Sequence, residues 1–234
     1  MVTSAINTKF GVYTTEQRLQ QTIDTVNSIK TRAPGSDIYL LEMAGIPLTP
    51  TQIDTLTGHV NGLIDFTSDP SVVGLFNSTD NWDIVKNVTE VMCFAKALEK
   101  LGKDAKQLQD CQRIFKISGR YILNDDFDIA WYDQYRMQSQ IVMSCSRNSQ
   151  FPYQTTLVEK QYMSRLWSWP TPLTDEIIGV YTKGLKYMAD RLSAGGYADI
   201  EHVLYKFLDP EKITEKDFVG ISGNIAPNGI AIKD

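Results

Sequence analysis

The chain has 234 residues, of which 42% are hydrophobic and 22% are charged, and its formal net charge at pH 7 is -5. This length and apolar content suffice for one well-buried domain, or for a domain with a smaller appended lobe, and they exclude a disordered chain. The mildly acidic balance, with no run of Lys or Arg, argues against a protein that binds nucleic acid by neutralising its phosphates.

The N-terminal segment has neither the charged stretch nor the apolar stretch of a secretory signal. No later stretch is apolar for long enough to cross a bilayer. The cysteines, Cys93, Cys111 and Cys145, are odd in number and far apart, which favours reduced thiols over a disulfide framework or a zinc site. We therefore expect a soluble protein of the cytoplasm, either of the producing cell or of a host cell.

The first regular pattern runs from residue 9 to residue 42. Residues 9–15 have strand character and end in hydroxyl residues, and residues 16–30 place apolar side chains at helical spacing. Thr15 is suited to cap that helix. Residues 37–42 are a continuous apolar run closed by Glu42, which is typical of a strand buried on both faces in a parallel sheet. The pattern predicts one βαβ unit.

Strands and helices continue to alternate as far as residue 123. Thr49 and Pro50 mark the start of a short helix, and residues 62–66 have the pattern of a strand. The strongest helical pattern covers residues 83–101. Residues 113–123 contain a β-branched and aromatic run that stops at Ser118-Gly119, which reads as a buried strand whose end opens into a turn. This alternation predicts an α/β fold with a mostly parallel sheet and helices on both faces.

The second half of the chain has a different pattern. Strand character is found near residues 138–146 and 154–158, and residues 221–229 read as a strand and a turn. Helical spacing over residues 175–192 and 199–208 predicts a helical C-terminal subdomain. Because no repeat or linker divides the sequence, we expect a single domain over 1–234, with an α/β half over 1–130 and the remainder over 131–234.

In open parallel sheets, ligands bind beyond the carboxyl ends of the strands. This rule gathers residues from distant segments at one edge of the predicted sheet: Tyr13, Thr14, Thr15, Glu42, Asp65, Ser118, Gly119 and Arg120. The small Ser118-Gly119 end allows close approach to the backbone, and Arg120 is a planar cation suited to an anion such as a diphosphate. A strand followed by a solvated turn with a surface arginine explains the same residues equally well.

Several familiar signatures are missing from the sequence. There is no G-x-x-x-x-G-K-[ST], no G-x-G-x-x-G after the first strand and no G-x-S-x-G, which argues against a P-loop enzyme, a dinucleotide-dependent dehydrogenase and an α/β-hydrolase. The chain has only two histidines, His59 and His202. We therefore expect neither a histidine metal site nor triad chemistry.

The remaining chemistry depends on carboxylates. Asp126 and Asp128 form a D-x-D, a spacing that lets two oxygens converge on a divalent cation, although a solvated Asp-rich turn is the competing reading. Glu201 is suited to be a general base that deprotonates an acceptor hydroxyl, but an acid in the first turn of a helix is also what the helix dipole favours.

These patterns resemble a known family. The element order, the strands over 10–15 and 38–42, the helix opening over 86–90, and the segment Phe115-Lys116-Ile117-Ser118-Gly119-Arg120-Tyr121 resemble the small GT-A-fold glycosyltransferase-like proteins of phage and bacterial polysaccharide clusters. The resemblance implies a sheet that binds a nucleotide sugar, with UDP as the expected nucleotide, at its strand ends. It also implies transfer of the sugar to an acceptor hydroxyl with a manganese or magnesium ion held by a D-x-D.

The resemblance also implies roles for individual residues. Tyr13, Thr14, Thr15 and Arg18 would border the nucleotide, and Glu42 and Asp65 would hydrogen-bond the base or ribose, although acids also end strands simply at water. Lys116, Ser118, Gly119 and Arg120 would lie at the diphosphate. Glu201, or secondarily Asp199, would be the base of an inverting displacement.

The sequence departs from the family pattern at the metal site. The expected D-x-D position at the end of the 113–117 run holds Ser118-Gly119-Arg120, and Asp126 and Asp128 come several residues later. Either Arg120, with Lys116, replaces the cation and stabilises the leaving diphosphate, or the later carboxylates fold back to hold a metal. We favour the first option, because the small Ser118-Gly119 end lets phosphate oxygens approach while Arg120 supplies a fixed charge.

Three functions follow from these observations. The leading hypothesis is a glycosyltransferase of hexosyltransferase type that acts on a nucleotide-sugar donor and a glycan or other hydroxyl acceptor. The second is a non-catalytic nucleotide- or carbohydrate-binding protein of the same fold. The third is an assembly protein whose aromatic residues form an exposed interface: Trp131, Tyr132, Trp167 and Trp169.

Overall fold

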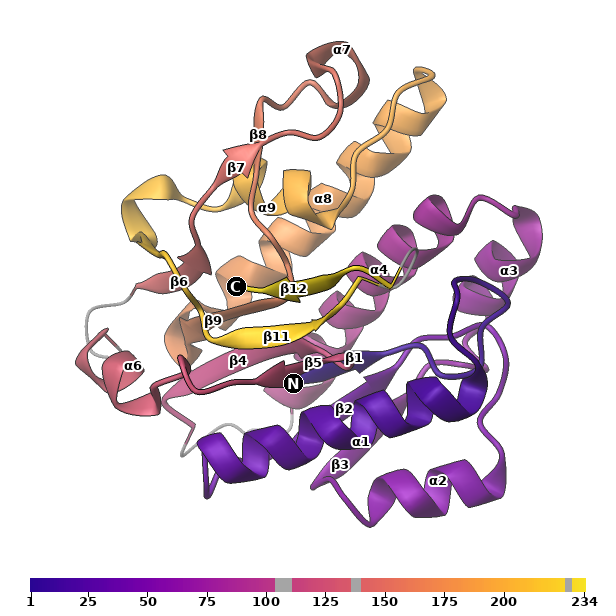
Figure 1. Cartoon of the computed structure of the whole chain (residues 1–234). Coiled ribbons are helices and arrows are strands. Elements are labelled where there is room, and N and C mark those ends of the chain that lie inside the picture. The colour runs from indigo at the N-terminus through magenta and orange to yellow at the C-terminus, as the bar shows by residue number, and fades with distance from the viewer. Residues whose placement is uncertain (104–110, 136–139, 226–228) are drawn as a thin grey trace. The chain divides into compact units, whose positions relative to one another are not determined.

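The structure is a computed structural model that describes residues 1–103, 111–135, 140–225 and 229–234 (Figure 1). The chain divides into two compact units. The first unit consists of Met1–Val85, Lys116–Trp131 and Phe218–Asp234. The second unit consists of Lys86–Phe115 and Tyr132–Asp217. Each unit therefore combines segments that are distant in the sequence, and the expected halves 1–130 and 131–234 stay a prediction.

Hydrogen bonding joins seven strands into one sheet in the order β10-β6-β9-β4-β1-β2-β3. The bounds of these strands are β1 Val2–Ser4, β2 Tyr39–Glu42, β3 Gly62–Asp65, β4 Arg113–Ser118, β6 Ile141–Ser144, β9 Leu166–Pro170 and β10 Ile213–Lys216. The neighbours β4, β1, β2 and β3 are parallel, as are β6 and β10, whereas β6 and β9 are antiparallel. The prediction of a mostly parallel sheet flanked by helices is confirmed.

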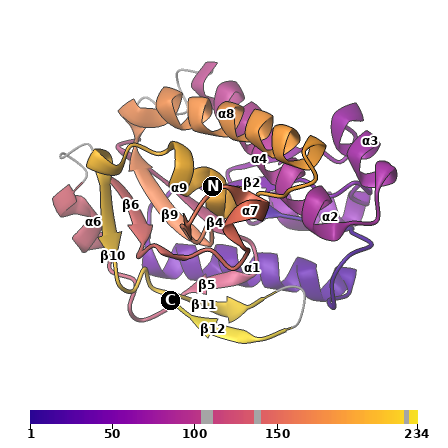
Figure 2. The same ribbon diagram turned by 90° about the horizontal axis from the view of Figure 1, so that it is seen from above.

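The first unit carries the α/β pattern of the N-terminal sequence. Its other elements are α1 Thr15–Arg32, α2 Pro50–Thr57, α3 Pro70–Ser78, β5 Tyr121–Leu123, β11 Ile221–Asn224 and β12 Ala231–Lys233. The strands β5, β11 and β12 form a small antiparallel sheet beside α1 (Figure 2). The backbone N–H of Leu123 donates to Ser28 Oγ over 3.0 Å, which fixes β5 to α1.

The second unit has a core of packed aromatic rings. Its helices and strands, two of which begin in the first unit, are α4 Trp82–Lys103, α6 Ile129–Tyr135, β7 Arg147–Asn148, α7 Tyr153–Thr156, β8 Lys160–Gln161, η2 Thr171–Leu173, α8 Thr174–Ser193, α9 Ile200–Phe207 and η3 Pro210–Lys212. The rings of Phe94 and Tyr181 have centroids 4.9 Å apart, and those of Trp167 and Trp169 are 4.6 Å apart. Offset and edge contacts of this kind add to the stabilisation from burial itself.

Local capping explains where the helices begin. Thr14 and Gln17 form a reciprocal capping box at the start of α1, so the cap is Thr14 and not the expected Thr15. Thr49 and Gln52 form the same box at α2, where Pro50 occupies the first turn as predicted. The predicted helices over 16–30, 83–101, 175–192 and 199–208 are all present. Within the described ranges, none of the helices is both long enough and apolar enough to span a bilayer.

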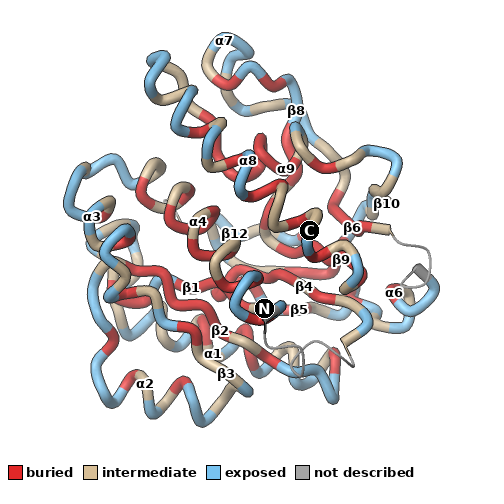
Figure 3. Tube along the Cα trace, turned by 180° about the vertical axis from the view of Figure 1, so that it is seen from behind, coloured by how far each residue is buried: buried red, intermediate tan, exposed pale blue. Residues whose placement is uncertain are grey.

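Burial follows the central strands of the first unit. Figure 3 shows β1 and β2 as buried, while the outer helices α2 and α3 have exposed segments. Val2, Leu40 and Leu41 have no exposed surface. Full burial of one such side chain stabilises the fold by about 1.5–3 kcal/mol. This burial explains why strands of three and four residues are stable here.

The prediction of a first strand over residues 9–15 is wrong. The first strand is β1, Val2–Ser4, and residues 5–14 form a loop in which Gly11 has a φ of 84° and the Val12 side chain is 57% exposed. The loop conformation is fixed by Arg18, whose guanidinium donates to the carbonyl oxygens of Phe10 over 2.6 Å and of Tyr13 over 3.2 Å. Those carbonyls are therefore not free to pair with a neighbouring strand.

The β-branched and aromatic run over residues 113–123 is two strands. The chain turns at Gly119 and Arg120, where the Arg120 N–H donates to the Ser118 carbonyl over 2.8 Å. β4 ends at Ser118 and stays in the large sheet, whereas β5 pairs with β11 in the small sheet. The Ser118-Gly119 end that the sequence indicated is therefore the point where the run breaks.

Two predictions for the second half are also wrong. Residues 153–156, expected as part of a strand over 154–158, form the helical turn α7, which ends at Leu157 in the left-handed conformation. The expected aromatic interface is absent for three of its four residues, because Tyr132, Trp167 and Trp169 are at most 1% exposed. Their rings belong to the core of the second unit.

The packing of α8 against α9 generates a stability prediction. A Cβ atom at Gly184 would lie 2.3 Å from Val203 Cγ1, so Gly184→Ala forces the two helices apart. We expect the free energy of unfolding to fall by about 1–3 kcal/mol, measured by chemical denaturation.

Gly179→Ala is the matched control, because Gly179 is in the same helix and a Cβ there meets nothing within 4 Å. That variant should be more stable than the parent by about 0.5–1 kcal/mol, since alanine loses less backbone entropy in a helix. Equal effects of the two substitutions would refute the packing argument.

Candidate functional site

The carboxyl ends of four parallel strands of the first unit form a common row. In the register, Ser4 of β1 pairs with Glu42 of β2, and Glu42 pairs with Asp65 of β3. On the other side of β1, Thr3 pairs with Ser118 of β4. The structure therefore brings Glu42, Asp65 and Ser118 to one edge of the sheet, as the strand-end rule requires.

Glu42 is a buried support within this row and has no exposed surface. Ser4 Oγ donates to Oε2 over 2.5 Å, and the N–H groups of Ile6 and Ala44 donate to Oε1 over 2.8 and 3.2 Å. Burial raises the pKa of Glu42 to about 7, although these hydrogen bonds favour the ionised form. The carboxyl group joins the ends of β1 and β2 and sets the start of the loop over 5–14.

Asp65 differs from Glu42 in exposure. It ends β3 as an exposed residue, and its Oδ1 accepts a hydrogen bond from the Thr67 N–H over 2.8 Å. Because the residue is exposed, a ligand in solution is able to reach its carboxylate. Of the two acids predicted for the base or ribose, Asp65 is thus the accessible one.

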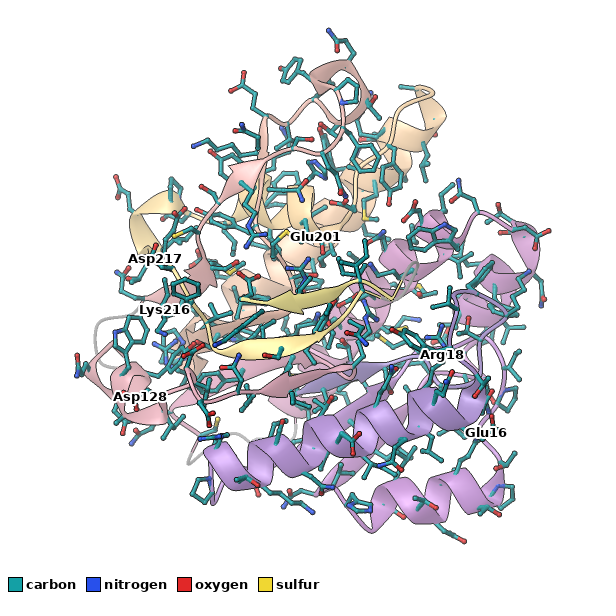
Figure 4. All side chains as sticks on the ribbon, in the orientation of Figure 1. Glu16, Arg18, Asp128, Glu201, Lys216 and Asp217 are labelled. Atoms are coloured by element: carbon teal, nitrogen blue, oxygen red, sulfur yellow. The ribbon has the colours of Figure 1, made fainter. Side chains whose placement is uncertain are left out.

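The loop after β1 carries Tyr13 and leads to Thr14 and Thr15 at the start of α1. Arg18 lies one turn into α1 and fixes the loop through its carbonyl contacts (Figure 4). Tyr13 is half-buried, and within the described part of the chain its buried hydroxyl has no hydrogen-bond partner. Leaving such a buried donor unsatisfied costs about 1–3 kcal/mol.

Arg120 follows β4 directly and lies near Arg18. Burial, and then the charge of Arg120, lower the pKa of Arg18, which means that the two guanidinium groups repel each other. The Arg120 guanidinium is 5.2 Å from the centroid of the Tyr121 ring, and its buried Nε has no hydrogen-bond partner among the described residues. The charge of Glu42 raises the pKa of Arg18 and so offsets part of this repulsion. The buried Arg120 Nε, a charged donor without a partner in the ranges that the structure describes, favours an anionic ligand.

Gly119 and Lys116 have structural explanations. A Cβ at Gly119 would lie 3.1 Å from the Thr3 carbonyl oxygen and 3.3 Å from Thr22 Oγ1, so glycine avoids tight contacts with β1 and α1. Lys116 is fully buried, and its Nζ donates to Ser118 Oγ over 2.9 Å. The small strand end therefore has a packing role, and the ligand approach that the sequence suggested stays a prediction.

Asp126 and Asp128 do not lie with the other candidate residues. Asp126 pairs with Lys233 over 2.8 Å, and Asp128 accepts a hydrogen bond from the Ala130 N–H at the start of α6. Their turn is held by an ion pair between Asp125 and Arg32, at the opposite end of α1 from Arg18 (Figure 4).

The rise of an α-helix puts these two ends of α1 roughly 20 Å apart. In the residues that the structure describes, no group of three or more His, Cys, Asp or Glu side chains is arranged to hold a metal ion. A D-x-D metal site at the strand ends is thus not formed by the described residues.

Glu201 belongs to the second unit, in the first turn of α9 (Figure 4). Its Oε1 accepts a hydrogen bond from Ser164 Oγ over 2.7 Å. Burial, and then the charge of Asp199, raise the pKa of Glu201. A buried carboxylate with a raised pKa is better suited to take up a proton than a solvated acid at a helix start.

The argument against histidine chemistry overlooked a chain of hydrogen bonds in the second unit. His202 Nε2 is 2.8 Å from Ser149 Oγ, and His202 Nδ1 is 2.5 Å from Asp199 Oδ1. Asp199 and His202 are three residues apart at a helix start, so their proximity was readable from the sequence. Ser149 is distant in sequence, and no local pattern indicated its position.

Comparison with known proteins gives a fold and no family. The sequence matches no protein-family model and no curated protein. Among the solved structures similar to the chain is that of core-mannan synthase A from Aspergillus fumigatus in its Mn/GDP form, with a TM-score of 0.51. The two share 9% sequence identity over 97% of this chain and 76% of that chain. The chain therefore has a GT-A-like α/β fold.

The buried Glu42 generates a pH prediction. Its pKa is raised from 4.5 to about 7 in the folded state, so the protonated form stabilises the fold, and this contribution is lost as the pH rises through 7. Glu42→Gln mimics the protonated form at every pH. We expect the unfolding free energy of the parent, relative to Glu42→Gln, to fall by about 3 kcal/mol from acid to mildly alkaline pH.

Denaturant titrations of both proteins across this pH range measure the difference directly. The glutamine keeps an oxygen for the Ile6 and Ala44 N–H groups and a polar group for Ser4, so the fold itself should persist. A difference that does not change with pH would contradict the prediction.

Proposed function

We propose that the chain is a glycosyltransferase that transfers a sugar from a nucleotide-sugar donor, with UDP as its nucleotide, to an acceptor hydroxyl. The observation that carries the proposal is the pair of neighbouring guanidinium groups of Arg18 and Arg120 at the strand ends of a GT-A-like sheet. Strand ends are where open α/β sheets bind ligands, and a glycosyltransferase of similar fold is known in a form with GDP and Mn.

The diphosphate is the part of the donor that fits this cluster. Arg120 Nε and the Tyr13 hydroxyl are buried donors without a partner among the described residues. A phosphate oxygen accepts hydrogen bonds from both kinds of group, and charge-assisted bonds of this type are about twice as strong as neutral ones. The N-terminal end of α1, next to Thr14 and Thr15, adds a favourable dipole for an anion.

The nucleoside and the supporting residues complete the donor site. Asp65, the exposed acid of the strand-end row, is proposed to accept hydrogen bonds from ribose hydroxyls. Glu42 is proposed to act indirectly, by holding the β1 end and the loop that carries Tyr13. Lys116 and Ser118 are proposed to support the base of the diphosphate site, while Gly119 keeps the strands in contact.

Charge on the leaving diphosphate increases as the bond between the sugar and the phosphate oxygen breaks. Fixed guanidinium groups stabilise this charge without reorganising, and we assign that role to Arg120 with Arg18. Asp126 and Asp128 lie at the opposite end of α1 from Arg18, so the proposal assigns no step to a metal.

Glu201 is proposed as the general base that accepts the proton of the acceptor hydroxyl. Its raised pKa brings the carboxylate closer to the pKa range in which a base is effective near neutral pH. Ser164, which donates to Oε1, orients the carboxylate. As the proton leaves, the acceptor oxygen attacks the anomeric carbon and the nucleoside diphosphate departs.

Donor binding tests the assignment of the guanidinium groups. Isothermal titration of the protein with UDP, with and without manganese, should give binding in both conditions, and Arg120→Ala should weaken it by roughly 30-fold or more. Arg32→Ala is the matched control, because Arg32 is on the surface of the same unit and pairs with Asp125. Absence of heat in both conditions would reject the donor site.

Substitution of the proposed base tests the chemical step. Glu201→Gln should bind UDP as the parent does, but donor turnover, measured as release of UDP from a UDP-sugar, should fall by roughly 100-fold. The glutamine still accepts the Ser164 hydrogen bond, so the local fold is retained. Unchanged turnover in this variant would remove Glu201 from the mechanism.

A non-catalytic nucleotide- or carbohydrate-binding protein of the same fold is the second candidate. The observation that favours it is the position of Asp126 and Asp128 at the opposite end of α1 from Arg18. UDP binding without any hydrolysis of UDP-sugars by the parent protein, across a panel of sugars, would select this alternative.

A further inference from the structure

In the second unit, the side chains of a serine, a histidine and an aspartate are linked by a chain of hydrogen bonds. Ser149 Oγ lies 2.8 Å from His202 Nε2, and His202 Nδ1 lies 2.5 Å from Asp199 Oδ1. The serine thus meets one ring nitrogen and the aspartate meets the other. This is the arrangement by which hydrolases of several unrelated folds activate a serine hydroxyl.

The aspartate is fixed by the start of α9. Asp199 is the N-cap residue, and its Oδ1 also accepts the backbone N–H of His202 over 3.0 Å. Burial alone would raise the pKa of Asp199, but the hydrogen bonds and charge of His202 outweigh burial and lower it. Asp199 Oδ1 lies beside His202 Nδ1, and in a neutral imidazole whose Nδ1–H donates to this carboxylate, Nε2 is the acceptor that faces Ser149 Oγ.

The histidine is shielded from water, with no exposed surface. The Phe151 ring packs on the imidazole with a centroid distance of 5.9 Å and on the Tyr197 ring at 5.2 Å. Shielding strengthens the hydrogen bonds along the chain because no solvent competes for them.

The serine is the partly accessible member. Ser149 is half-buried in the loop between β7 and α7, and its N–H donates to the Glu159 carbonyl over 2.8 Å. Its Oγ accepts the Phe151 N–H over 3.0 Å, and its hydroxyl donates to the Phe151 carbonyl over 2.8 Å. The hydroxyl has one proton, so it turns from this carbonyl to His202 Nε2 when the serine is activated. The N–H of the next residue, Gln150, donates to the Gln161 side-chain oxygen over 3.1 Å.

The N–H that follows a nucleophilic serine is the usual first donor of an oxyanion hole. In this structure the Gln150 N–H is occupied by the buried Gln161 side chain, so its use as an oxyanion donor requires Gln161 to rotate away. The loop thus holds the nucleophile and a candidate oxyanion donor, and α9 holds the base.

We propose that Ser149, His202 and Asp199 of the second unit form an active site that cleaves esters of small acyl groups. The small acyl group follows from the aromatic rings of Phe151 and Tyr197 beside the histidine, which limit the space at the serine. The proposal does not depend on the glycosyltransferase assignment.

The reaction consists of two acyl transfers. Ser149 Oγ attacks the ester carbonyl carbon while its proton passes to His202 Nε2, and the ester C–O bond then breaks as Nε2 returns that proton to the leaving alcohol. The acyl group is now bound to Ser149 Oγ. A water molecule gives a proton to Nε2 and attacks the acyl carbon, and the carboxylic acid leaves as the proton returns to Oγ.

Two probes test this site in the full chain. A fluorophosphonate should add one phosphonyl group to Ser149, detected by mass spectrometry of the intact protein and of its peptides. Hydrolysis of p-nitrophenyl acetate should show a burst of nitrophenol that corresponds to the acyl-enzyme. Ser149→Ala should abolish both signals, whereas Ser146→Ala, a serine in the segment before β7, should retain them.

Asp199→Asn separates catalysis from structure. Asparagine caps a helix as well as aspartate does, so the fold should persist by circular dichroism. It no longer holds the imidazole in the required tautomer, and labelling should slow by roughly 100-fold or more. The proposal is overturned if the parent is not modified by excess probe, if Ser149→Ala is modified at the parental rate, or if Asp199→Asn reacts as fast as the parent.

Discussion

The hydrogen bonds of the buried Glu42 carboxyl group are the interaction on which the first unit depends. They join the end of β2 to Ser4 of β1 and to the N–H of Ile6, so they set where β1 stops and where the following loop begins. β1 pairs with β2 on one side and with β4 on the other, and the Glu42 carboxyl group adds a side-chain link at its end. The same burial that makes the link strong raises the pKa of the group, and the fold therefore contains one carboxyl group that is partly protonated at neutral pH.

The loop that Glu42 begins is completed by Arg18, and the charge of Arg18 is then left beside that of Arg120. Repulsion between the two guanidinium groups lowers the stability of the folded state, and a bound anion would remove this repulsion. Functional sites commonly hold such unfavourable charge. Charges that are arranged to bind a ligand lack an opposite partner while the ligand is absent. The proposed diphosphate site depends on this repulsion, which a bound diphosphate would relieve.

The second unit shows how a polar network is placed within an aromatic core. Asp199 acts at once as the cap of α9 and as the partner of His202, so one side chain satisfies a helix end and fixes an imidazole. Ser164 donates a hydrogen bond to Glu201 in the first turn of the same helix and so fixes that carboxylate. Buried polar groups are stable only when each has a hydrogen-bond partner. In these two networks the partners are themselves side chains that are able to take part in acid–base chemistry.

Sequence patterns alone determined the element types wherever the pattern was local. Capping residues with 3.6-residue spacing gave α1, α2, α4, α8 and α9, and apolar runs closed by an acid gave β2 and β3. They failed where a distant contact decided the outcome, as in residues 9–15, which were expected as a strand and form a loop whose carbonyl oxygens accept hydrogen bonds from Arg18.

The candidate sites divide in the same way. The strand-end rule gathered Glu42, Asp65 and Arg120 because parallel strands place their carboxyl ends together whatever the connecting loops do. Only the tertiary structure separated Asp126 from that edge and brought Ser149 to His202, since both depend on the path of the chain between elements. Local propensity acts over a few residues, whereas the position of a side chain in a site is set by the packing of the whole unit.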